Sequence, residues 1–166
     1  MLNKKKISII FVCVCCISFI SQTCLSEPVL QVDPSNRCSV CGMFVAKYPA
    51  WVAEIIHENG DVEFFDGVKD MMAYYFHPDQ YGGGGKTDNA EIWVKDYYSL
   101  SFIDARKAFF VTGSDVFGPM GHEFIPFSSQ EASEAFLKDH KAKSILTFTE
   151  ITEQMVDSMR EGRKMK

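Results

Sequence analysis

Residues Cys38-Ser39-Val40-Cys41-Gly42-Met43 place two thiols and a thioether within one short stretch of the chain. A second soft donor, Met120, lies far downstream in Gly118-Pro119-Met120-Gly121-His122. Between Pro119 and Gly121, this methionine has no place in a regular helix or strand, so we expect it on a loop, where functional side chains commonly lie. The sequence predicts a fold that brings Met120 back to Cys41.

Length and composition indicate a globular protein of one ordinary domain or two small ones. The chain has 166 residues, of which 46% are hydrophobic and 23% charged. The net charge is −5, and residues 1–26 contribute three lysines and no acids, so the remainder carries −8. A body this acidic repels phosphate backbones, which argues against nucleic acid as a partner.

The first 26 residues have the pattern of a signal peptide. Lys4, Lys5 and Lys6 precede an apolar run over residues 7–20 that is shorter than a membrane-spanning helix. We therefore expect a periplasmic or otherwise extracytoplasmic protein. Two routes of processing fit: lipidation of Cys24, which would anchor the protein to a membrane, or cleavage after Ser26.

The remaining sequence predicts two similar units in tandem. Residues 51–58 alternate like a strand, Asn59-Gly60 predicts a hairpin turn with positive φ at both residues, and residues 62–65 return as a second strand. We expect Asp66 to cap the helix that follows and residues 92–94 to form a third strand. The predicted buried face of this helix consists of Val68, Met71, Met72 and Tyr75.

The second half repeats this order of elements. Strands are predicted over residues 108–112, 123–126 and 145–151. Ser128 and Glu131 form a capping-box pattern for the helix between the last two strands. This helix is expected to bury Ala132, Ala135 and Phe136. The predicted fold is α+β, with two ββαβ units whose small sheets pack against helices.

The corresponding boundaries divide the chain into five segments. Residues 1–26 are the signal peptide, and residues 27–37 are a linker. The first ββαβ unit, with the cysteine motif, covers residues 38–98, and the second, with the Met120 loop, covers residues 99–151. Residues 152–166 form a C-terminal tail with helical character.

Cys38 and Cys41 are the two cysteines that remain after the leader, and several roles fit them. In an oxidising compartment such a pair can close as a disulfide or serve as a redox centre. A closed zinc site needs four ligands, and the sequence after the leader has no second cysteine pair and no closely spaced histidines. A site of two or three soft donors needs less, and thioether sulfur suits Cu(I) better than zinc.

The candidate copper ligands are therefore Cys41 and Met120, with His122 and Met43 as further donors. Met43 can instead pack beneath the first strand, and His122 can be an exposed loop histidine. Asp66 and Glu123 fit solvated or capping carboxylates rather than an acid–base pair. The residues thus favour a binding protein over an enzyme.

Several short motifs together resemble the NosL family, the accessory proteins of nitrous oxide reductase assembly. The resemblance spans residues 38–151, nearly the whole predicted body of the chain. The motifs are Cys41-Gly42-Met43, Tyr48-Pro49, Phe64-Phe65-Asp66-Gly67, Gly118-Pro119-Met120-Gly121 and Pro126-Phe127.

This resemblance implies an exported, lipid-anchored Cu(I) chaperone that passes copper toward the copper–sulfide centre of nitrous oxide reductase. Its expected partners are that reductase and an ABC-type membrane transporter. The family's cysteine ligand falls on Cys41 and its methionine ligand on Met120, with His122, Met43 or Cys38 as the third ligand. The alternative function is that of an exported dithiol/disulfide redox protein using Cys38 and Cys41.

Overall fold

The computed structural model describes residue 28, residues 31–83 and residues 87–162. The predicted signal peptide and Cys24, the predicted site of lipidation, lie outside these residues. None of the helices in the described part of the chain is long and apolar enough to cross a lipid bilayer.

The first unit is an antiparallel sheet with a helix inserted between its strands. Strands β1 (Ala53–Ile56) and β2 (Val62–Phe65) form a hairpin, α1 (Val68–Phe76) follows, and β3 (Glu91–Lys95) pairs with the other side of β1. A short strand, β4 (Phe102–Asp104), extends the sheet to the order β2-β1-β3-β4. Every residue of β1 is buried, as expected for a strand with neighbours on both sides.

The β1–β2 turn forms where the sequence predicts it, but with a different geometry. His57 and Asp61 close the loop through an N–H to carbonyl bond of 2.9 Å, and Gly60 N–H donates to the His57 carbonyl at 2.8 Å. Gly60 has a φ of +88°, whereas Asn59 does not have positive φ. The expected positive φ at both residues is therefore wrong, because this three-residue loop needs only one left-handed position.

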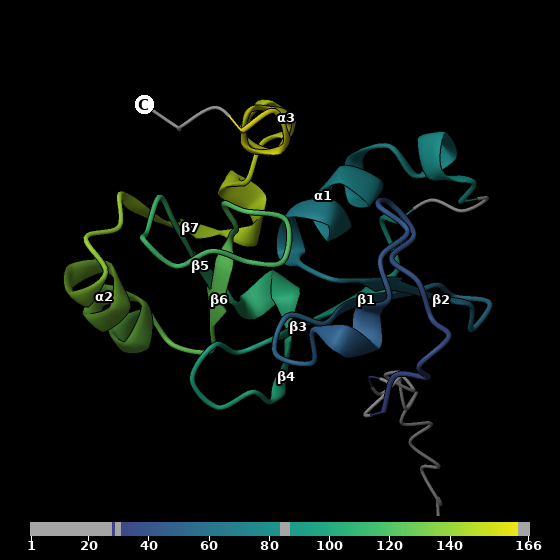
Figure 1. Cartoon of the computed structure of the whole chain (residues 1–166), viewed down its shortest axis with the longest axis horizontal. Coiled ribbons are helices and arrows are strands. Elements are labelled where there is room, and N and C mark those ends of the chain that lie inside the picture. Colours follow the sequence, from purple (N-terminus) through teal and green to yellow (C-terminus); the bar gives the residue numbers. More distant parts are fainter. Residues whose placement is uncertain (1–27, 29–30, 84–86, 163–166) are drawn as a thin grey trace, which may run out of the picture.

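The second unit repeats the first with fewer strands. Strands β5 (Phe109–Thr112) and β6 (Ile125–Phe127) precede α2 (Gln130–Asp139), and β7 (Ser144–Thr147) completes a sheet of order β6-β5-β7. Figure 1 shows this sheet and α2 on one side of the molecule and β1, β2 and α1 on the other. In both units the first strand is central, which confirms the predicted α+β fold of two ββαβ units.

Helix α2 differs from its prediction in two details. Its N-cap is Ser129, whose side-chain oxygen accepts a hydrogen bond from Ala132 N–H at 3.2 Å, one residue later than the predicted Ser128. Phe136 is buried as expected, but Ala135 is exposed and Ala132 only half-buried. The helix thus buries a narrow stripe, because only one of its faces lies on the sheet.

Short connecting segments and a last helix complete the chain. Helix α3 (Glu153–Arg160) lies within the predicted C-terminal tail and packs beside α1. Turns of 3-10 helix occur at Val45–Lys47, Pro78–Tyr81, Ala105–Lys107 and Phe148–Glu150.

One hydrophobic core joins the two units. Phe110 and Phe124 of the second unit are fully buried among Ile55, Phe65 and Met71 of the first. A smaller cluster beneath α2 comprises Val111, Ile125, Phe127 and Phe136. Because the larger core is shared, the two units pack against each other as one body.

Candidate metal site at the start of helix α1

The thiol motif forms a tight turn attached to the end of β2. Cys38 N–H donates to the Met43 carbonyl at 2.8 Å, and Gly42 N–H donates to the Cys38 carbonyl at 2.9 Å. Gly42 has a φ of +77°, a conformation that favours glycine. Ser39 N–H donates to the Phe64 carbonyl at 3.0 Å, which fixes the turn against the strand that leads into α1.

Both cysteines are free thiols, and each faces a carboxylate. Cys41 Sγ lies 3.4 Å from Asp66 Oδ1, and Cys38 Sγ lies 3.7 Å from Asp70 Oδ2. Cys41 N–H also donates to Cys38 Sγ at 3.5 Å. Cys38 is only 3% exposed, whereas Cys41 is half-buried and therefore the more accessible sulfur.

The surroundings favour the protonated thiols in the absence of a metal ion. Burial raises the pKa of Cys38 to about 11, although N–H groups of Cys41, Asp66 and Val40 oppose the shift. Burial also raises the pKa of Cys41, against the opposing effect of the Met43 N–H. A cation that binds here must displace protons from sulfur, so binding and proton release are coupled.

Asp66 does not cap α1, contrary to the prediction. The N-cap is Gly67, which has no side chain to offer, and Asp66 turns toward Cys41 instead. Glu123 supplies the cap from the second unit: its Oε1 accepts from Lys69 N–H at 2.5 Å and from Phe124 N–H at 2.9 Å. Of the two roles expected for Glu123, a capping carboxylate is confirmed, whereas a solvated carboxylate is not, because Glu123 is buried.

The loop that carries Met120 lies over the same helix end. Gly118 and Gly121 exchange two backbone hydrogen bonds of 2.8 and 3.1 Å, which close a turn around Pro119 and Met120. Lys69 Nζ donates to the Met120 carbonyl at 2.7 Å and to the His122 carbonyl at 3.0 Å. These bonds attach the loop to the first turn of α1.

The predicted donors on this loop differ in their surroundings. The side chain of Met120 is 49% exposed. The ring of His122 packs against Phe117, with 4.9 Å between ring centroids. Met43, on the thiol turn, is half-buried.

The two sulfur-bearing segments therefore converge on four consecutive residues, 66–69. The thiol turn reaches them through the contact between Cys41 and Asp66, and the Met120 loop reaches them through Lys69 and Glu123. Asp66 and Asp70 are not among the site residues predicted from the sequence. Their spacing of four at a helix start, directly after the strand that holds the thiol turn, is the signal that points to them.

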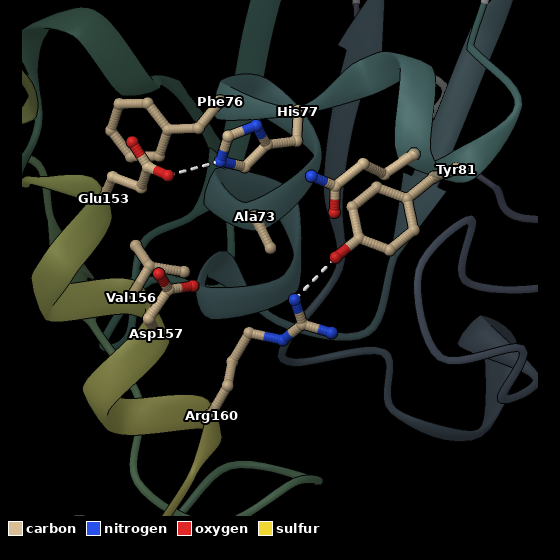
Figure 2. A pocket seen from close by; sticks show the side chains of 9 residues that line it. Ala73, Phe76, His77, Tyr81, Glu153, Val156, Asp157 and Arg160 are labelled. Carbon is tan, nitrogen blue, oxygen red and sulfur yellow. Dashed lines mark hydrogen bonds and ion pairs between the residues drawn. The ribbon is translucent and has the colours of Figure 1, made fainter.

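A pocket of about 230 Å³ lies between α1 and α3, and Arg160 is one of its lining residues. Figure 2 shows two polar pairs on its wall: His77 with Glu153 at 2.5 Å, and the guanidinium of Arg160 donating to the Tyr81 hydroxyl at 2.6 Å. Arg160 Nε also lies 3.8 Å from Asp70 Oδ1. The pocket wall thus supplies a positive charge to the carboxylate that faces Cys38.

Fold and site together define an α+β protein of two ββαβ units with a sulfur-rich candidate metal site. The chain belongs to the NosL family, whose model matches residues 28–156. It is 26% identical over 147 residues to the copper-binding lipoprotein NosL of Stutzerimonas stutzeri, covering 82% of this chain and 73% of that protein. It is 30% identical over 138 residues to the protein of the same name from Achromobacter cycloclastes, covering 76% and 68%.

A solved structure agrees with this assignment. The crystal structure of the copper chaperone NosL from Shewanella denitrificans superposes with a TM-score of 0.63 at 27% identity. The match covers 76% of this chain and 99% of that one.

Proposed function

We propose that this protein is an extracytoplasmic Cu(I)-binding metallochaperone in which Cys41 and Met120 hold one copper ion as cargo. The observation that carries the proposal is the convergence of the thiol turn and the Met120 loop on the start of α1. The copper-binding names of its relatives support the choice of metal.

The chemistry of the two sulfur atoms fits a metal that is passed on. Thiolate and thioether are soft donors that suit Cu(I), and the thioether binds without losing a proton. Because Met120 is exposed and Cys41 is half-buried, a partner's ligand can approach an ion held between them. His122, Met43 and Cys38 are the alternatives for a third donor.

The same surroundings argue against the dithiol redox alternative. A redox-active cysteine needs a lowered pKa so that its thiolate can act as a nucleophile. Here burial raises the pKa of both Cys38 and Cys41. Forming a buried thiolate costs free energy, and a metal ion offsets this cost because it binds the thiolate directly. Disulfide exchange offers no such compensation to the attacking thiolate.

The assignment is tested by titrating the reduced protein with Cu(I) against a chromogenic chelator. We expect Met120→Ala to weaken Cu(I) binding by at least about 10-fold, since even the loss of an outer-shell partner weakens metal binding by about 10–100-fold. Met155→Ala, which removes a half-buried thioether on α3, is the matched control and should leave the affinity unchanged. Equal affinities of the wild type and Met120→Ala, with both proteins folded by circular dichroism, contradict the proposal.

We further propose that the copper is destined for the copper–sulfide centre of nitrous oxide reductase, through an ABC-type maturation transporter. The family membership supports this step. Copper-loaded protein mixed with the copper-free reductase and its transporter should lose its metal to that fraction, measured by metal analysis after size exclusion. The proposed destination is contradicted if this protein binds the transporter but keeps its copper.

Lipid anchoring is proposed from the leader and from relatives named as lipoproteins. Mass spectrometry of the mature N-terminus distinguishes an acylated Cys24 from a free terminus after Ser26. Acylation supports a membrane-bound chaperone, and cleavage after Ser26 indicates a periplasmic one without an anchor.

A further inference from the structure

Lys69 is a buried lysine at an unfavourable position in α1. It is the second residue of the helix and is only 3% exposed. The positive end of the helix dipole lies at the N-terminus, so a cation in the first turn is destabilising. Burial of an ammonium group adds a desolvation cost unless the group has partners. Neither the helix nor the core explains this lysine, and its partners outside the helix do.

The ammonium group of Lys69 binds the main chain of the Met120 loop. Lys69 Nζ donates to the Met120 carbonyl at 2.7 Å and to the His122 carbonyl at 3.0 Å. Hydrogen bonds with a charged donor are about twice as strong as neutral ones. The backbone N–H of the same lysine donates to Glu123 Oε1 at 2.5 Å. Lys69 therefore contacts this segment through both its side chain and its main chain.

The side chain of Met120 has little packing to hold it in place, since it is 49% exposed. The turn around it is closed by the two backbone hydrogen bonds between Gly118 and Gly121. At the base of the loop, a Cβ added to Gly118 would lie 3.2 Å from Glu123 Cβ, so the loop packs closely there. The main chain of the loop thus determines where the thioether lies, and Lys69 ties this main chain to α1.

We propose that Lys69 is a positioning residue for Met120: its ammonium group holds the loop in the conformation that binds Cu(I). This inference rests on the proposed role of Met120 as a copper ligand. A loop that is already ordered loses less conformational entropy when the metal binds, so the affinity is higher. Lys69 does not bind copper itself, because a protonated amine has no lone pair to donate.

The charge of Lys69 alone predicts an effect of the opposite sign. An ammonium group repels a nearby cation, so removal of a residue that acted only through its charge would strengthen Cu(I) binding. Removal of a positioning residue weakens Cu(I) binding instead. The sign of the change in Cu(I) affinity therefore separates the two roles.

The test is a Cu(I) titration of reduced variants against a chromogenic chelator. Lys69→Met keeps most of the apolar length of the side chain but removes the donor. We expect it to weaken Cu(I) binding by about tenfold, the lower end of the range for residues that orient metal ligands. Lys107→Met, the control, removes an ammonium group on an 83% exposed side chain and should leave the affinity unchanged. An unchanged or higher affinity in folded Lys69→Met overturns the proposal.

A double variant distinguishes positioning from a general loss of stability. If Lys69 acts through Met120, the variant with both Lys69→Met and Met120→Ala should bind Cu(I) as Met120→Ala does, because the ligand that Lys69 holds is already absent. Losses that multiply in the double variant overturn the proposal. Wild-type affinity in Lys69→Met beside weakened binding in Met120→Ala overturns this inference alone, whereas wild-type affinity in Met120→Ala overturns the copper assignment as well.

A second variant and a measurement on the wild type decide the question if Lys69→Met does not fold. Lys69→Gln, which is shorter and uncharged, then takes its place in the titrations with the same expected result. In the metal-free wild type, the N–H of Gly121 donates to the Gly118 carbonyl at 3.1 Å and should be protected from hydrogen exchange. Exchange of this N–H at the rate of an unstructured peptide overturns the proposal, because the loop is then not held before copper binds.

Discussion

The two ββαβ units open their helices with equivalent segments, and the two segments have different partners. Phe65-Asp66-Gly67 leads into α1, and Phe127-Ser128-Ser129 leads into α2. Ser129 caps α2 with its own hydroxyl, at the surface. Gly67 cannot cap α1, and the buried carboxylate of Glu123 does so from the other unit.

Each junction also receives one carboxylate from the opposite unit. Asp96, which follows β3 of the first unit, accepts from Ser128 N–H at 2.7 Å and from the N–H groups of Tyr98 and Ser99. At the first junction Glu123 has the corresponding role, because it accepts a hydrogen bond from Lys69 N–H. Burial raises the pKa of Glu123 to about 8, against the opposing effect of the Lys69 charge. Burial acts in the same direction on Asp96, but hydrogen bonds from Ser99 and Ser128 outweigh it and lower its pKa.

The difference shows how a repeated unit acquires a specialised site. At α2 the cap is local, so the junction needs no other segment. At α1 the missing side chain of Gly67 leaves room for the Glu123 carboxylate that caps the helix, since a Cβ there would collide with it. The junction that depends on a distant segment is also the one that faces the thiols.

The largest expected effect separates the two junctions by function. Cys41→Ser removes the accessible sulfur at the first junction. We expect Cu(I) affinity to fall by at least about 100-fold, because the loss of a direct ligand should exceed the effect of replacing a residue that only contacts a ligand. Ser129→Ala at the second junction should leave Cu(I) affinity unchanged. The measurement is the same chelator competition, and a comparable loss in both variants contradicts the separation.

The second prediction concerns pH. The ordinary pKa of a glutamate, 4.5, applies to the unfolded chain, whereas the pKa of Glu123 in the fold is about 8. Between these pH values the folded protein keeps a proton that the unfolded chain releases, so rising pH favours unfolding. The loss of unfolding free energy from pH 5 to pH 8 should reach a few kcal/mol.

Glu123→Gln tests the cause of this slope. Its amide oxygen still accepts from Lys69 N–H but does not titrate, so urea unfolding at several pH values should show a flatter pH dependence. An unchanged slope in Glu123→Gln shows that another group is responsible.

A reciprocal exchange of the two N-caps gives the third prediction. Gly67→Ser introduces a side chain where Glu123 packs, and overpacking of this kind costs about 1–3 kcal/mol of unfolding free energy. Ser129→Gly at the equivalent position of α2 should cost only a few tenths of a kcal/mol, roughly the usual loss for a glycine N-cap. Equal losses, measured by urea unfolding, contradict the idea that Gly67 is required for the approach of Glu123 to the start of α1.

The smallest effect is expected at Asp96. Its pKa is lowered in the fold, so its stabilising effect is present above the ordinary aspartate value of 3.8 and is lost as pH falls through the folded pKa. Asp96→Asn should cost about 1 kcal/mol at neutral pH, the usual net value of a hydrogen bond, and should remove part of the acid sensitivity. Thermal unfolding at pH 3 and pH 7 measures both.

Local patterns predicted the elements of this fold well because they depend on nearby residues. The alternation before Asn59-Gly60, that turn itself and the repeated strand–helix order each lie within a few residues. The cap of α1 could not be predicted in this way, since Asp66 offers a good local cap and Glu123 is far away in sequence. Asp66 and Asp70, which face the two thiols, were not predicted as site residues. A local cap of α1 was a sufficient role for Asp66, and its contact with Cys41 joins residues 25 positions apart in the sequence.

The central claim is that Cys41 and Met120 share one Cu(I) ion, and selenium labelling tests it directly. The protein is produced with selenomethionine, reduced and loaded with one Cu(I), and X-ray absorption is recorded at the copper edge. We predict sulfur scatterers together with a selenium scatterer, which persists in Met155→Leu and disappears in Met120→Leu. A copper spectrum without selenium, or one that Met120→Leu leaves unchanged, contradicts the claim.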